Sequence, residues 1–306
     1  MIIVPIAYFG GGIVTTAGSL WLWHKVGDAQ SNNKNNNNND NNDDNVSSRG
    51  VEASQSAPLP YFKSYFKAIA NPCHHITNQT GYVALCVAEN KLILPELSNH
   101  LINGLKSSSN EKSSASSSTA KIAFENEVNF CYNDTRGIEN VRQQVAKFIT
   151  KNFIHGNKNS NQDSSLAAKA EQIVLGAGAA AILNFIFRFV AEENDVVLIP
   201  APYYAAFEYD MSIIAKCVPY PVHMDDPAKG PNTNELEQVY QTLHKQGRKV
   251  RSLLLTNPNN PLGIIYSPDT IRNCIAWARS KNMHTIVDEI YALSVHDVSF
   301  VCRPFF

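Results

Sequence analysis

Three polar side chains stand where two apolar stretches of the chain end, so that they can meet one ligand. Asn260 follows the stretch 250–256, while Asp288 ends the stretch 284–288 and Tyr291 comes just after it. Each stretch is typical of a buried strand, and open α/β sheets bind their ligands at the carboxyl ends of strands. An amide, a carboxylate and a phenol can together bind the polar atoms of a ring. The sequence therefore predicts that Asn260, Asp288 and Tyr291 converge on one small aromatic molecule.

The chain around these residues alternates between predicted strands and predicted helices. Strands are predicted over 172–175, 196–200, 216–220, 250–256 and 284–288, and helices over 137–153, 179–191, 203–214, 235–246 and 268–281. This alternation is typical of βαβ units, which build a largely parallel sheet with helices on both faces. The predicted fold class is therefore α/β.

Length and composition limit the classes of protein to which the chain can belong. With 306 residues, 44% of them hydrophobic, it can bury a sizeable core in one or two domains. A formal net charge of −1 without a long basic block gives no electrostatic footprint for nucleic acid, which favours a small-molecule ligand. The six cysteines lack the spacing of a zinc site, and no metal is expected. We interpret them as reduced core thiols in a reducing compartment.

The first 60 residues differ in composition from the rest of the chain. Residues 1–23 carry no charged side chain and are about as long as a bilayer-spanning helix, with Trp21 and Trp23 as interfacial residues. We expect residues 1–27 to be a membrane anchor that leaves the catalytic domain in the cytoplasm. The alternatives are a cleaved signal peptide and a merely apolar extension of a cytoplasmic protein.

Two further stretches of biased composition are expected to lie outside the packed core. The Asn-rich residues 28–60 are expected to form a disordered linker, because such a composition cannot bury enough apolar surface to offset chain entropy. The Ser-rich residues 107–119 are expected to be an insertion in the domain formed by residues 61–306.

A glycine-containing turn, Gly176–Ala181, follows one predicted strand and opens a predicted helix. Its free backbone amides and the helix dipole are suited to a phosphate group. The turn also satisfies the dinucleotide pattern Gly-x-Gly-x-x-Ala. A dinucleotide fold needs an acid after the second strand to hold a ribose, yet that strand ends Ile199-Pro200-Ala201-Pro202 and Asp195 precedes it. The turn therefore favours a phosphate that is not part of a dinucleotide.

The two strand-end motifs resemble those of a known enzyme family. They read Asn257-Pro258-Asn259-Asn260-Pro261-Leu262-Gly263 and Asp288-Glu289-Ile290-Tyr291. Both are similar to motifs of the fold type I pyridoxal-phosphate enzymes, the class I and II aminotransferases, and within these to the branch that resembles 1-aminocyclopropane-1-carboxylate (ACC) synthase. The resemblance runs from about Tyr61 to the end of the chain. It implies pyridoxal 5'-phosphate (PLP) as cofactor, an α-amino acid as substrate and a homodimer in the complete protein.

The resemblance assigns three residues to the cofactor ring. Asp288 is expected to keep the pyridine nitrogen protonated, because only the protonated ring drains electrons from the substrate Cα. Tyr291 and Asn260 are expected to donate to the phenolic oxygen of the ring. Asp288 and Tyr291 are thus the expected catalytic residues, while Glu289 is expected to point away from Asp288 by strand alternation.

Other positions are assigned by the same resemblance to the phosphate, the ring face and the substrate. Gly178, Ala179 and Ala180 are expected to bind the phosphate, although many relatives have a hydroxyl residue in this turn and here only backbone donors are offered. Tyr204 is expected to stack on the ring. Tyr132 is expected to reach the cofactor phosphate of a neighbouring subunit, and Glu89, in Ala88-Glu89-Asn90, to lie near the substrate.

One residue that the resemblance requires does not occur in the sequence. The Schiff-base lysine, which also moves the Cα proton, lies beyond the Asp-x-x-Tyr strand in the family, and no lysine follows Asp288. We therefore expect an incomplete large domain without the small C-terminal domain, and a chain that cannot turn over amino acids. The leading hypothesis is an incomplete aminotransferase or ACC synthase-like enzyme. A catalytically inactive binding protein of this fold and an unrelated α/β nucleotide-binding protein are the alternatives.

Overall fold

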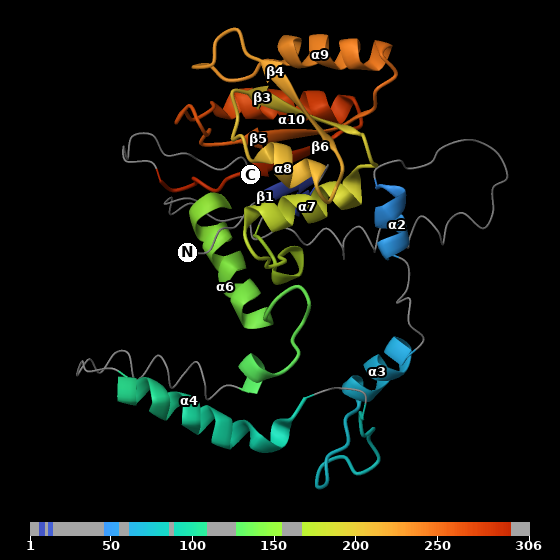
Figure 1. Cartoon of the computed structure of the whole chain (residues 1–306), viewed down its shortest axis with the longest axis vertical. Helices are drawn as coiled ribbons and strands as arrows, with labels where there is room; N and C mark the ends of the chain where they lie inside the picture. The colour runs from blue at the N-terminus through green and yellow to red at the C-terminus, as the bar shows by residue number, and fades with distance from the viewer. Residues whose placement is uncertain are drawn as a thin grey trace, which may run out of the picture. The chain divides into compact units, whose positions relative to one another are not determined.

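The computed structural model describes seven segments of the chain (Figure 1). They are residues 6–9, 12–14, 46–54, 61–85, 89–108, 127–154 and 167–294. The chain divides into two compact units, one formed by residues 1–55 and 136–306 and the other by residues 56–135. The first unit contains the sheet, and each unit is described by itself.

Four parallel strands form the centre of the first unit. They are β3 (Val196–Ala201), β4 (Val218–His223), β5 (Val250–Thr256) and β6 (His284–Asp288), in the order β6-β5-β3-β4. In this register Leu254 of β5 lies beside Ile286 of β6, and Thr256 lies beside Asp288. The carboxyl ends of β5 and β6 therefore bring together the two motifs, whose nearest residues, Gly263 and Asp288, are 25 positions apart in the sequence. The predicted α/β class with a parallel sheet is confirmed.

Helices cover both faces of this sheet (Figure 1). On one face α7 (Ala179–Val190) and α8 (Phe207–Ser212) pack in a core that includes Phe187 and Ile286. On the other face lie α9 (Thr233–Lys245) and α10 (Pro268–Ser280). Because a strand of a doubly covered sheet is buried on both sides, all seven residues of β5 are buried instead of alternating between core and solvent.

The two outer helices begin at residues whose side chains cap them. The Asn232 side chain accepts hydrogen bonds from the backbone N–H groups of Asn234 and Glu235, at 2.9 and 3.1 Å. The Glu235 carboxylate accepts one in return from the backbone N–H of Asn232 at 3.0 Å. Ser267 Oγ accepts from the backbone N–H of Thr270 at 3.1 Å. These caps fix the starts of α9 and α10.

The segment before α7 differs from the prediction. The predicted helix 137–153 is present as α6 (Glu139–Ile149) and a π-helical turn (Thr150–Ile154). The strand predicted over 172–175 is wrong, because Ala170–Gln172 forms a 3-10 turn and the residues after it have no regular structure. Ile173 is buried against α6 instead of in the sheet, which explains the apolar run without a strand.

The membrane-spanning helix predicted over residues 1–23 is not supported. None of the helices in the described segments combines the length and the apolar character that crossing a membrane requires. Within residues 1–23 the described segments are β1 (Ile6–Phe9) and β2 (Gly12–Val14), which extend the sheet: β1 pairs antiparallel with β6, and β2 pairs antiparallel with β1. The β-branched and aromatic residues of these two segments favour extended backbone over helix.

A short helix lies among the residues that the sequence analysis assigns to the linker. This helix, α2 (Ser48–Ser54), packs beside α7 (Figure 1). Ser47 Oγ donates to two carbonyl oxygens near the end of α7, each at 2.8 Å. The Arg49 guanidinium donates to the carbonyl oxygens of Ala191 and Ala215, also at 2.8 Å each. Residues 46–54 are thereby fastened to the carboxyl end of α7.

The second unit consists of helices and loops in its described residues. Its elements are α3 (Tyr61–Ala70), a 3-10 turn (Lys91–Ile93), α4 (Leu94–Ser108) and a second 3-10 turn (Glu127–Phe130). Between α3 and the first turn, the backbone N–H of Cys73 donates to the carbonyl of Tyr82 at 2.9 Å and closes a loop. The Ser-rich insertion 107–119 lies outside the described residues except for its first two positions.

The described cysteines are free thiols in different surroundings. Cys217 and Cys274 are buried, and burial raises their pKa values to about 11 and about 12. Cys131 is partly buried, whereas Cys73 is exposed. The interpretation of the cysteines as core thiols is therefore wrong for Cys73, and Cys86 and Cys302 lie outside the described residues.

Candidate functional site

Asp288 is a buried acid at the carboxyl end of β6. Asp288 is 4% exposed, and the backbone N–H of Ile290 donates to its Oδ1 at 3.1 Å. Burial, and to a smaller extent the Asp210 carboxylate on α8, raise the pKa of Asp288 to about 6, although the hydrogen bond from Ile290 acts in the opposite direction. A cationic N–H group of a ligand would favour the ionised form, because an opposite charge offsets the penalty of burial.

Glu289 is a second buried acid directly after Asp288. It is 7% exposed, and burial together with the neighbouring Asp288 carboxylate raises the pKa of Glu289 to about 8. Burial thus raises the pKa of Glu289 further than that of Asp288. Asp288 is therefore the acid of this pair that ionises more readily and can accept from a ligand.

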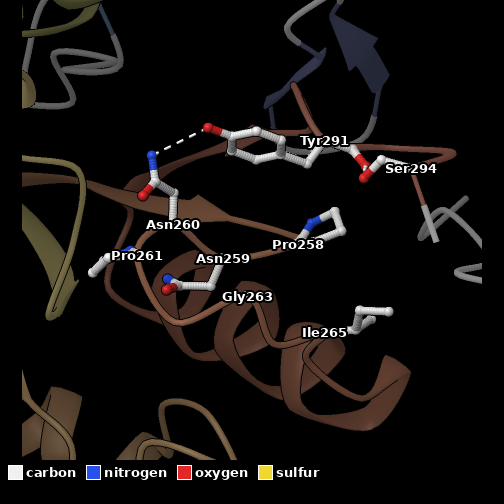
Figure 2. Close-up of a pocket in the computed structure, with 8 residues that line it drawn as sticks. All are labelled: Pro258, Asn259, Asn260, Pro261, Gly263, Ile265, Tyr291 and Ser294. Atoms are coloured by element: carbon white, nitrogen blue, oxygen red, sulfur yellow. Dashed lines mark hydrogen bonds between the residues drawn. The ribbon is translucent and has the colours of Figure 1, made fainter. Parts of the chain in front are cut away.

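Asn260 and Tyr291 meet beside a cavity of about 410 Å³ (Figure 2). Asn260 Nδ2 donates to Tyr291 Oη at 3.2 Å, although the two residues lie 31 positions apart. The cavity is large enough for a small aromatic ligand. Its lining consists of Pro258, Asn259, Asn260, Pro261, Gly263, Ile265, Tyr291 and Ser294. The structure thus brings Asn260 and Tyr291 together, with Asp288 at the end of the adjoining strand and not in the cavity wall.

The turn that carries Asn260 is hydrogen-bonded to a buried tyrosine. Tyr266 is 1% exposed, and its backbone N–H donates to Asn257 Oδ1 at 2.8 Å. Its hydroxyl accepts from Asn259 Nδ2, also at 2.8 Å. Gly230, at a φ of +78°, leaves room for the ring, since a Cβ there would lie 2.5 Å from Tyr266 Cδ1. This support was not predicted from the sequence, in which its signal is an aromatic residue three positions beyond Gly263, the last residue of the motif.

The turn before α7 presents backbone donors without side-chain competition. Gly178 has a φ of +93°, a conformation that residues with a side chain rarely adopt, and it precedes the first helical residue. No side chain caps this helix. The first amides of α7, which include those of Ala179 and Ala180, have no partner within the helix and can face an anion.

Tyr204 lies in the loop between β3 and α8 and is 46% exposed. Its ring packs at right angles against Phe207, with 5.5 Å between the ring centroids. The preceding Tyr203 donates from its hydroxyl to the Glu208 carboxylate at 2.5 Å. Tyr204 is therefore the half-exposed aromatic residue of this loop, and it keeps ring surface for a planar ligand.

Tyr132 and Glu89 contact each other within the second unit. Glu89 Oε1 accepts from the backbone N–H of Tyr132 at 2.6 Å, and the Tyr132 residue is 72% exposed. The structure thus brings together two residues predicted from separate motifs. Their roles toward the phosphate and the substrate stay predictions.

The four parallel strands, with helices on both faces and polar residues at their ends, define an α/β protein, and in open sheets of this kind ligands bind at the carboxyl edge. Residues 102–303 match the family described as aminotransferase class I and II. Because this match covers more than half of the chain, the chain belongs to that family. The family depends on PLP, and the expected cofactor is confirmed at this level.

Curated relatives place the chain near the ACC synthases. ACC synthase 2 of Solanum lycopersicum is 29% identical over 239 residues, which are 78% of this chain and 46% of the relative. The Probable aminotransferase ACS12 of Arabidopsis thaliana is 30% identical over 258 residues, 84% of this chain and 49% of the relative. The Homo sapiens protein named Probable inactive 1-aminocyclopropane-1-carboxylate synthase-like protein 2 is 28% identical over 265 residues, 83% of this chain and 42% of the relative.

The chain spans about half the length of the curated relatives it matches. Among solved structures, an aminotransferase from Mycobacterium tuberculosis is 18% identical, with a TM-score of 0.48, over 71% of this chain and 56% of that one. The alanine aminotransferase from Pyrococcus furiosus is 20% identical, with a TM-score of 0.43, over 53% of this chain and 37% of that one.

Proposed function

We propose that the chain forms the cofactor-binding part of a PLP-dependent enzyme that acts on an α-amino acid, as an aminotransferase or an ACC synthase-like enzyme. The observation that carries this proposal is the buried acid Asp288 at the strand end next to the hydrogen-bonded pair of Asn260 and Tyr291. Bound PLP supplies an electron sink for the negative charge that develops at the substrate Cα. The residues of this chain orient the ring and control its protons.

Asp288 holds the pyridine nitrogen in its protonated form. One of its oxygens accepts from the backbone N–H of Ile290, so the other can accept from the ring. A charge-assisted hydrogen bond of this kind is worth roughly 1.5–3 kcal/mol, which raises the protonated population of the nitrogen by about one to two powers of ten. The same bond offsets the burial that raises the pKa of Asp288.

Asn260 and Tyr291 hold the phenolic oxygen of the ring. Tyr291 Oη accepts from Asn260, so the Tyr291 proton remains to be donated. The Asn260 amide carries a second N–H that can donate to the same acceptor. Two donors that are fixed to each other restrict the rotation of the ring in its plane.

The remaining assignments concern the phosphate, the ring face and a second subunit. Gly178, Ala179 and Ala180 bind the phosphate with backbone amides, and Tyr204 stacks on the ring. In a homodimer Tyr132 reaches the phosphate of the neighbouring subunit, and Glu89 lies near the substrate. The exposure of Tyr132 and its contact with Glu89 support this pairing of roles.

A second candidate function is a protein of this fold that binds PLP without turning over amino acids. The similarity to the Homo sapiens relative named Probable inactive 1-aminocyclopropane-1-carboxylate synthase-like protein 2 supports this candidate. For either candidate the 306 residues by themselves are expected to show no turnover of amino acids, since a Schiff-base lysine moves the Cα proton and none is present among residues 289–306. Robust transaminase activity of the purified chain would contradict this expectation.

The 306-residue chain is expected to bind PLP, and Asp288→Asn is expected to weaken this binding by about tenfold to a hundredfold at pH 7.5. The reason is the loss of a charge-assisted hydrogen bond to the ring nitrogen. Equilibrium dialysis with absorbance detection of PLP measures the dissociation constants. The matched control is Asp210→Asn, because Asp210 acts on Asp288 only through its charge, and this variant should bind PLP at least as well as wild type.

The proposal fails if the folded wild-type chain does not retain PLP. It also fails for Asp288 alone if Asp288→Asn binds PLP as tightly as the control variant does. Far-ultraviolet circular dichroism of each variant separates these outcomes from loss of folding.

A further inference from the structure

Two hydroxyl groups on β5 are buried without a hydrogen-bond partner among the described residues. They belong to Ser252, which is 0% exposed, and to Thr256, which is 5% exposed. Buried hydroxyls in folded proteins nearly always have a partner. Ser252 lies within the strand, whereas Thr256 is its last residue and stands at the edge where the proposed ring site is. A hydroxyl without a partner at this edge can donate a hydrogen bond to a neighbouring side chain that becomes ionised when a ligand binds.

Thr256 lies directly beside Asp288 in the sheet. The two residues are partners in the parallel register of β5 and β6, and the backbone N–H of Asn257 donates to the Asp288 carbonyl at 3.0 Å. Leu254 and Ile286, two positions earlier on each strand, both belong to the core under α7 and α8. Since side chains two positions apart share a face, Thr256 and Asp288 share this face. Neighbouring strands lie about 4.8 Å apart. Rotation about the Cα–Cβ bond of Thr256 can therefore bring its hydroxyl within reach of the Asp288 carboxylate.

The surroundings of the Asp288 carboxylate contain few donors. The backbone N–H of Ile290 donates to one oxygen. The charged groups that face it are Asp210 from α8 and the adjoining Glu289, which are both acids. No basic side chain in the described part of the chain contributes to its electrostatic environment. An ionised Asp288 therefore has a place for one more donor, and the Thr256 hydroxyl is next to it.

We propose that Thr256 is a positioning residue of the ring site, whose hydroxyl donates to the ionised carboxylate of Asp288 and holds it as the acceptor for the pyridine N–H. This inference rests on the proposed function. The hydroxyl stabilises the charged form of Asp288, so it extends to lower pH the range in which the ring nitrogen is held. Thr256 acts through Asp288 and does not contact the reacting atoms.

The test measures binding of pyridoxamine 5'-phosphate to the 306-residue chain between pH 5 and pH 8. This probe is fluorescent and needs no lysine for attachment. Wild-type binding should weaken as pH falls, because a protonated Asp288 no longer attracts a cationic ring. In Thr256→Val the pH midpoint of this loss of binding should move up by about one unit. The reason is that the free energy of a hydrogen bond to a charged group corresponds to about one pKa unit. At pH 5, below both midpoints, the variant should bind roughly tenfold more weakly than wild type.

Two matched variants and one analogue isolate the hydroxyl. Ser252→Ala removes the other buried hydroxyl of β5, about 13 Å away along the strand, and should leave the midpoint unchanged. Thr256→Ser keeps the donor and should restore the wild-type midpoint. An analogue with C–H in place of the ring nitrogen should bind Thr256→Val and wild type equally, because Asp288 has no N–H to accept from.

Each result either supports or overturns the inference. It is overturned if Thr256→Val has the same midpoint as Ser252→Ala, if Thr256→Ser fails to restore the midpoint, or if Thr256→Val weakens the carbon analogue as much as the natural ring. If the folded wild-type chain binds no probe, the proposed function is overturned together with this inference. Retained binding with an unshifted midpoint overturns the role of Thr256 alone.

Discussion

The Glu289→Gln variant is expected to be more stable than the wild-type chain by roughly 3–5 kcal/mol at pH 8, and about equally stable at pH 4. Burial and the Asp288 carboxylate raise the pKa of Glu289 from 4.5 to about 8 in the folded chain. A raised pKa means that the wild-type residue costs nothing below pH 4.5 and destabilises the fold as pH rises toward 8. Glutamine keeps the shape of the side chain and carries no titrating proton, so the variant does not lose this stability.

Urea denaturation of both chains at pH 4, 6 and 8 measures the difference. The control is Glu139→Gln, on an exposed position of α6, which should leave the pH dependence of stability as it is in wild type. Parallel pH profiles for wild type and Glu289→Gln would show that Glu289 is not a buried, protonated acid.

Phe187→Ala is expected to lower the free energy of unfolding by about 3–5 kcal/mol. Phe187 is fully buried in the core between α7 and the sheet, and its truncation leaves a cavity in that core. The matched control is Phe185→Ala on the same helix, because Phe185 is 62% exposed and should cost less than about 1 kcal/mol. Denaturant unfolding of the two variants gives both values. Equal losses for the two would mean that α7 does not present Phe187 to the sheet.

The central strands and outer helices could be predicted from the sequence because local signals mark both of their ends. The predicted bounds of β5 and β6 agree with the structure, since continuous apolar runs end at polar turn residues there. The bounds of α9 and α10 agree within two residues because Asn232 and Ser267 cap them. The segment 172–175 was predicted as a strand because its apolar residues indicate burial. Apolar residues alone do not reveal whether a segment packs in a sheet or, as here, against the helix α6.

The proximity of Asn260 and Tyr291 was predictable from the sequence, whereas the residues that support them were not. Asn260 and Tyr291, read from two motifs, form a hydrogen bond in the structure. Thr256 was not singled out, because its proximity to Asp288 depends on strand register, which the sequence does not state. Tyr266 was missed for a similar reason, since its partners are fixed by the path of the turn. Roles that depend on neighbours across the sheet therefore require the structure.

The attachment of residues 46–54 to the end of α7 has a consequence for synthesis. The Ser47 hydroxyl donates to the carbonyl of Phe189, which is synthesised 142 positions later in the chain. At 5–20 residues per second a ribosome needs about 7–28 s to cover that interval. The whole of residues 56–135 is made during this time, and this unit can begin to fold while the sheet does not yet exist. The contacts of Ser47 and Arg49 thus become possible only after the second unit has been completely synthesised, and before β5 and β6 of the sheet exist.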